Sequence, residues 1–167
     1  MLGLYENFPT TIHKIAYFTT QASNKKLQQK LTATLQKLNT ETLTLEAVSD
    51  PSIPQGTVNF EFGIAEADTF NYLDSEETAK LLKTISKQPL QTMDFFCAAR
   101  YHKSQDERET RLRFDYYMLR FTFNEDTIEV RAFHERGPRY TSPEDVINLI
   151  ANKMNEGSMK KLLKEIH

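Results

Sequence analysis

Arginine is confined to one part of this chain, and its chemistry makes that part the first candidate for function. All eight arginines lie between residues 100 and 139, whereas the basic side chains elsewhere are lysine and histidine. The planar guanidinium suits carboxylates, phosphates and aromatic faces. The sequence therefore directs attention to this window. Its arginines are Arg100, Arg108, Arg111, Arg113, Arg120, Arg131, Arg136 and Arg139.

Two alternating stretches within the window, 112–123 and 128–136, predict a hairpin that turns at Asn124-Glu125-Asp126. Matching the apolar positions sets its register, because a slip of one residue would move every side chain to the other face. The opposed pairs are then Phe123–Ile128, Phe121–Val130, Leu119–Ala132, Tyr117–His134 and Asp115–Arg136. The same register puts Arg120 directly opposite Arg131. Such a like-charge pair needs screening by Glu129, Glu135, a partner's carboxylate or a bound anion.

The other face of this hairpin interleaves aromatic and guanidinium side chains. We expect Tyr116, Phe133, Arg120 and Arg131 to form a binding surface for an acidic partner. A second interpretation is structural, with this face solvated or covered by the terminal helices. A third is binding of single-stranded nucleic acid, as in sheets that stack bases on aromatic rings. The glycine- and aromatic-rich strand motifs of such sheets are absent, so nucleic acid is the least favoured partner.

A different hypothesis comes from two Arg–His pairs, Arg100-x-His102 and His134-x-Arg136. A spacing of two places each pair on one face of its strand. If the strand ends meet, the four side chains could grip a phosphate-bearing small ligand in a pocket between the sheet and the C-terminal helix. The alternative is that these charges pair with acids across the sheet.

Catalytic templates are absent. The histidines His13, His102, His134 and His167 lack the spacing of a metal site, and the glycines are isolated. Cys97 is the single cysteine and lies in an apolar run, which favours a small buried hydrophobe over a catalytic thiol. Asp94, in the same run, is expected to pair locally. We therefore predict a non-catalytic module without catalytic residues, metal or cofactor.

Composition bounds the remaining classes. The chain has 167 residues, of which 39% are hydrophobic and 26% are charged, as is typical of one globular domain spanning residues 1–167. The net charge of −2 excludes generic electrostatic attraction to nucleic acid or anionic lipid. The sequence shows neither a leader pattern nor an apolar run long enough to span a membrane, so it predicts a cytoplasmic protein without membrane contact.

The periodicities predict the element order β-α-β-β-α-β-β-β-α-α. Strands are expected at 11–19, 42–48, 57–64, 91–102 and in the hairpin, with turn chemistry at 50–56 and a charged loop at 103–109. Helices are expected from Ser23 to Leu38, from about Asp74 to Pro89, and from Ser142 to Gly157. A short terminal helix is predicted from the stripe Met159, Leu162, Leu163 and Ile166.

Short turns between consecutive strands favour antiparallel pairing. The sequence therefore predicts an α+β fold with one curved antiparallel sheet of about six strands and helices on one face. Helix-grip and ferredoxin-like architectures both fit this pattern. An open sheet has edges to cover, so either another protein or a second copy of the chain is expected as a partner.

Overall fold

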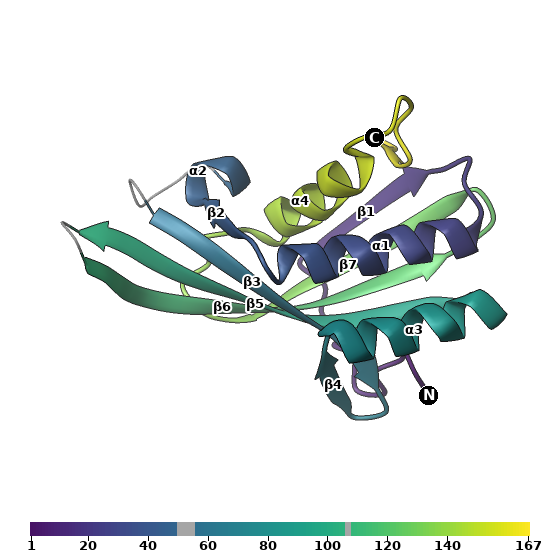
Figure 1. Ribbon diagram of the computed structural model, residues 1–167, viewed down its shortest axis with the longest axis horizontal. Coiled ribbons are helices and arrows are strands. Elements are labelled where there is room, and N and C mark those ends of the chain that lie inside the picture. Colours follow the sequence, from purple (N-terminus) through teal and green to yellow (C-terminus); the bar gives the residue numbers. More distant parts are fainter. Residues whose placement is uncertain (50–55, 106–107) are drawn as a thin grey trace.

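The fold is α+β, with one open antiparallel sheet of eight strands and helices packed against it (Figure 1). The computed structural model describes residues 1–49, 56–105 and 108–167, and all their side chains except those of residues 104–112. The helices in this part of the chain cover one face, which we call the inner face. The N-terminal segment and the short strand β4 (Thr69–Tyr72) contact the opposite, outer face through Tyr5 and Phe70. The predicted fold class is confirmed, with eight strands in place of about six.

The strands are β1 (Lys14–Thr19), β2 (Thr42–Thr44), β3 (Gly56–Glu66), β4 (Thr69–Tyr72), β5 (Thr92–Gln105), β6 (Arg108–Phe123), β7 (Thr127–Arg136) and β8 (Lys164–Glu165). The helices are α1 (Asn24–Leu38), α2 (Leu45–Val48), α3 (Ser75–Lys87) and α4 (Pro143–Asn155). The sheet order is β2-β3-β5-β6-β7-β1-β8, and β4 pairs with β3. None of the helices described here is long and apolar enough to cross a membrane.

The three long helices begin where their capping residues predict. The Ser23 side chain accepts the Lys26 N–H at the start of α1. Ser142 and Asp145 form a reciprocal capping box at α4, whose first residue is Pro143. A leucine stripe then buries one side of α1 against the sheet, with Leu27, Leu31, Leu35 and Leu38 each at most 1% exposed.

The C-terminal segment corrects one prediction, because it is not a helix. Gly157 turns the chain at a φ of 76°, and Lys164–Glu165 then pairs with β1 as the edge strand β8. The Asn155 side chain holds Leu163 by two hydrogen bonds, from Asn155 Nδ2 to Leu163 O and from Leu163 N to Asn155 Oδ1. Leu163 is buried and Met159 is fully exposed, so the apolar stripe is divided between core and solvent.

Three other element boundaries differ from the prediction. Residues 42–48 split into β2 and α2, because Leu45 turns into the core. The sequence missed β4, which follows a turn through Ala67 at a φ of 58°. The charged loop predicted at 103–109 is mostly strand, since β5 and β6 pair out to Gln105 and Arg108. Residues 106–107 and the turn predicted over 50–55 lie outside the described residues.

The register of β6 and β7 agrees with the predicted pairing from Phe123–Ile128 to Tyr117–His134. Beyond that point it shifts, so Arg136 lies opposite Tyr116 and not opposite Asp115. Glu135 is the extra residue on β7 at this bulge. The shift moves Arg136 to the outer face, whereas Asp115 faces inward like Tyr117 and binds the loop that follows β7, as described below.

Candidate interaction surface

The outer face brings aromatic side chains of neighbouring strands into rows. In one row, Phe96 of β5 pairs with Met118 of β6, which pairs with Phe133 of β7. In the next row, Ala98 pairs with Tyr116, which pairs with Arg136. We call the set Phe96, Tyr116, Met118, Phe133 and Arg136 the outer patch. Its four apolar members are partly buried and Arg136 is exposed.

Ring contacts extend this patch into a continuous line across the sheet. Phe96 lies between Tyr116, at a centroid distance of 5.7 Å, and Phe70 of β4, at 5.5 Å. Tyr5 of the N-terminal segment continues the line, 4.7 Å from Phe70. At the other end, Phe114 stacks on Tyr116 at 5.7 Å. The line joins side chains from β4, β5, β6 and the N-terminal segment.

Three arginines of this face are neutralised within the face. Arg120 binds Asp94 with two nitrogens, Nε to Oδ1 at 2.7 Å and Nη2 to Oδ2 at 2.8 Å. These hydrogen bonds raise the pKa of Arg120 above its usual value. Arg131 pairs with Glu129, and Arg100 pairs with Glu61. Both members of each pair belong to the same sheet, so these arginines contribute little net charge to the surface.

Arg136 differs from these three arginines. Its guanidinium carbon lies 4.5 Å from the centre of the Tyr116 ring, which is cation–π geometry. Among the residues that the structure describes, no carboxylate forms an ion pair with it. An exposed guanidinium held over an aromatic ring is available to a carboxylate from outside the chain.

The N-terminal segment crosses the outer face beside the patch. The Tyr5 N–H donates to Asp94 Oδ2 at 2.7 Å, and Arg120 Nη2 donates to Tyr5 O at 3.3 Å. The Phe8 ring lies 4.3 Å from the Arg120 guanidinium. Farther along, the His13 ring stacks on Phe133 at 4.9 Å. The face therefore already holds a segment of its own chain through a paired carboxylate and guanidinium.

The four side chains of the hypothetical anion pocket do not converge. His134 lies on the inner face, where its Nε2 is 2.7 Å from Asp115 Oδ1. Arg100 is occupied by Glu61 and Arg136 by the Tyr116 ring, both on the outer face. His102 pairs in register with Thr57 of β3 and lies next to the bulge between β5 and β6.

Sequence reasoning missed a buried polar cluster around Asp115, which has 0% exposure. Besides His134, the carboxylate accepts the backbone N–H groups of Arg139 at 2.7 Å and Tyr140 at 2.9 Å. The Tyr101 hydroxyl also donates to it, at 2.6 Å. The sequence did carry a signal for this cluster, because Asp115 and Tyr117 alternate in step with the apolar residues that face the core. Four donors saturate this carboxylate, which fits a role in anchoring the loop after β7.

Burial dominates the electrostatics of this cluster. It raises the pKa of the Tyr101 hydroxyl well above its usual value, with a further contribution from the hydrogen bond to Asp115. Burial also raises the pKa of Tyr117, whose hydroxyl donates to the Thr141 carbonyl. The pKa of the Cys97 thiol rises for the same reason, so this buried cysteine stays protonated and forms part of the core, as predicted.

Within the described part of the chain, no three His, Cys, Asp or Glu side chains are arranged to hold a metal ion. Asp94 is fully buried and pairs with Arg120 on the neighbouring strand, 26 residues away, in place of the local pairing that the sequence predicted. The outer patch therefore remains the best candidate for function. Comparison of the chain with protein-family models, with curated proteins and with solved structures found no match.

Proposed function

We propose that this protein is a non-catalytic binding module whose outer patch docks an extended, acidic segment of a partner protein. The observation that carries the proposal is Arg136, exposed and held over Tyr116 at the margin of an aromatic surface. An apolar side chain of the partner would cover the row Phe96–Met118–Phe133. A carboxylate beside it would pair with Arg136, which gives the interaction its charge specificity.

The paired arginines favour a protein partner over single-stranded nucleic acid. Binding to a phosphate backbone needs free cations along the groove. Arg100, Arg120 and Arg131 are already matched by carboxylates of the same face. Two ring faces that bases would need are also in use, because Arg136 lies over Tyr116 and His13 stacks on Phe133.

The N-terminal segment supports an extended partner. Its backbone near Tyr5 is held by Asp94 and Arg120, which bind one N–H and one carbonyl of the same residue. A surface that holds a segment of its own chain by backbone contacts is suited to a further polypeptide segment beside it. The alternative of a phosphate-bearing ligand at Arg100, His102, His134 and Arg136 has weaker support, because His134 points to the opposite face.

Selection from a displayed library of random peptides tests this proposal. The baits are the wild-type protein, Met118→Asp, Arg136→Glu and the control Lys83→Glu, an exposed lysine on α3. We expect wild type and the control to enrich peptides that combine an apolar residue with Asp or Glu. Both outer-patch variants should lose these peptides while keeping the thermal midpoint of the wild type.

Peptides retained equally by Met118→Asp and Arg136→Glu would place the binding surface elsewhere. A labelled single-stranded oligonucleotide, titrated at constant salt, provides the arm for nucleic acid. The wild type could bind the oligonucleotide, lose that binding in Arg136→Glu, and enrich no peptide. That outcome would replace the protein-docking proposal with nucleic-acid binding.

A further inference from the structure

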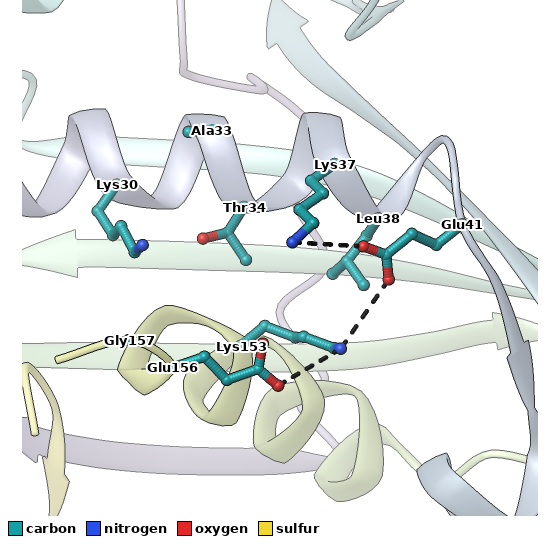
Figure 2. Close-up of a pocket in the computed structure, with 9 residues that line it drawn as sticks. All are labelled: Lys30, Ala33, Thr34, Lys37, Leu38, Glu41, Lys153, Glu156 and Gly157. Carbon is teal, nitrogen blue, oxygen red and sulfur yellow. Dashed lines mark ion pairs between the residues drawn. The ribbon is translucent and has the colours of Figure 1, made fainter.

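A cavity on the other side of the molecule has a chemistry unrelated to the outer patch. It lies between α1 and the C-terminal end of α4 and measures about 380 Å³ (Figure 2). We call it the α1–α4 groove. Its lining residues are Lys30, Ala33, Thr34, Lys37, Leu38, Glu41, Lys153, Glu156 and Gly157.

Two of the three lysines in the groove are paired with its two carboxylates. Lys37 Nζ lies 3.8 Å from Glu41 Oε1, and Lys153 Nζ lies 3.9 Å from Glu41 Oε2. Lys153 also reaches Glu156 Oε1 at 3.5 Å. These separations are long for ion pairs, and each ammonium has three N–H donors. Lys37 and Lys153 can therefore attract a further anion without leaving their glutamates.

Lys30 has no such partner. Its side chain is partly buried, yet no carboxylate of the described residues forms an ion pair with it. Three lysines against two glutamates leave the groove with one excess positive charge. An ammonium without an ion-pair partner is stabilised by any anion that can approach it.

Thr34 adds a second donor that lacks a partner. Its side chain is only 7% exposed and lines the cavity, and its hydroxyl makes no hydrogen bond to a residue described by the structure. By contrast, the Thr32 hydroxyl in the same helix donates to the Gln28 carbonyl at 2.8 Å. In Figure 2 the Thr34 hydroxyl and the Lys30 ammonium point toward each other along the groove.

We infer that the α1–α4 groove binds a small anion, with a phosphate or carboxylate group held between the Lys30 ammonium and the Thr34 hydroxyl. Lys37 and Lys153, with the glutamates that pair with them, line the far side of the same cavity. The oxygens of such a group accept from both donors at once, so the anion replaces solvent at two groups that have no partner among the described residues.

Inorganic phosphate and acetate are the probes that distinguish the two anion classes. Each is titrated into the protein at constant ionic strength while amide chemical shifts are followed by NMR. We expect saturable shifts in the millimolar range for at least one of them, centred on α1 and the end of α4. The probe that binds more tightly identifies the class.

Three variants of α1 locate the site. Lys30→Gln removes a charged donor and should weaken binding about tenfold or more, while Thr34→Val removes the hydroxyl at nearly constant shape and should weaken it severalfold. Lys25→Gln removes the same charge from an exposed position outside the groove and should bind as the wild type does. Thermal midpoints without anion verify that each variant is folded.

Equal affinities of Lys25→Gln and Lys30→Gln would overturn the inference, because binding would then reflect overall charge. Shifts without saturation at tens of millimolar would also overturn it. The outer-patch variant Met118→Asp should retain anion binding, since the two surfaces lie on opposite faces of the sheet. If the groove does not bind an anion, the peptide-docking proposal is unaffected. If the outer patch does not bind peptides, the inference about the groove is likewise unaffected.

Discussion

Arg120 and Arg131 lie directly opposite each other on β6 and β7, and each pairs with a carboxylate of its own. Arg120 donates two hydrogen bonds to Asp94 of β5, which is fully buried. Arg131 pairs with Glu129 of β7 nearer the surface. Two like charges in register are thus tolerated because each has its own partner. The two ion pairs differ in burial, and that difference decides what each arginine contributes to stability.

We expect Arg120→Ala to destabilise the fold by about 3–5 kcal/mol, because it leaves the Asp94 carboxylate buried and unpaired. Arg131→Ala should change the free energy of unfolding by less than about 1 kcal/mol, since its pair is only partly buried and Glu129 keeps access to solvent. Urea denaturation of both variants checks this contrast. Similar losses for the two variants would show that the burial of Asp94 does not govern the pair.

Substitution of Gly137 should be far more damaging than substitution of Gly157. Gly137 has a φ of 118°, and a Cβ there would collide with Phe114 O and Asp115 Oδ1. Gly137→Ala should therefore cost more than about 3 kcal/mol. Gly157 has a φ of 76°, and a Cβ there would meet no heavy atom of the described residues within 4 Å, so Gly157→Ala should cost only about 1 kcal/mol. Thermal unfolding of the two variants, side by side, tests the difference.

The buried Asp115 cluster should behave as one unit. Asp115→Asn exchanges an accepting oxygen for an N–H₂ group facing backbone donors, and we expect a loss of about 3 kcal/mol. Tyr101→Phe removes the hydrogen bond with Thr141 Oγ1 as well as the one to Asp115 Oδ2, and should cost about 1–3 kcal/mol. Because the two substitutions share the bond between Tyr101 and Asp115, the double variant should lose less than the sum. Strict additivity in denaturant titrations would argue against the cluster.

Leu163 and Met159 test the division of the C-terminal stripe. Leu163 is 4% exposed and Met159 is fully exposed, at 106% of its reference area. Leu163→Ala should therefore cost about 2–4 kcal/mol, while Met159→Ala should lie within about 0.5 kcal/mol of wild type. A terminal helix that buried both side chains would instead give comparable losses, which calorimetry would reveal.

His13 should make stability weakly dependent on pH. Partial burial, followed by the charges of Arg139 and His134, lowers its pKa below the usual 6.5. The His134 N–H donates to His13 Nδ1 at 2.9 Å, and this contact requires the neutral ring. Stability is thus fully present above the unfolded pKa and falls as the pH drops below it.

We expect the thermal midpoint of the wild type to fall between pH 8 and pH 5 by about 2 °C more than that of His13→Asn. The effect is small because the ring is largely exposed. Equal falls for the two proteins would remove His13 as the titrating group, and a larger fall for the variant would reverse the sign of the pKa shift.

Local sequence patterns predicted most of the helices and strands and the pairing of β6 with β7. The spacing of apolar residues and the N-cap residues predicted α1, α3 and α4, because apolar side chains recur every three or four residues on the buried face of an amphipathic helix. The match of apolar faces set the β6–β7 register from Phe123 to Tyr117 and with it the opposition of Arg120 and Arg131. These features depend on residues close together in the chain or joined by one short turn.

Tertiary structure alone decided what those side chains contact. Asp94 meets Arg120 only because β5 lies beside β6 in one register, 26 residues apart in sequence. One extra residue at Glu135 moved Arg136 onto Tyr116 of the outer face, and the loop after β7 brought the Tyr140 N–H to Asp115 on the inner face. Long-range register, bulges and the path of both termini follow from packing the whole chain at once, and no local pattern carries that information.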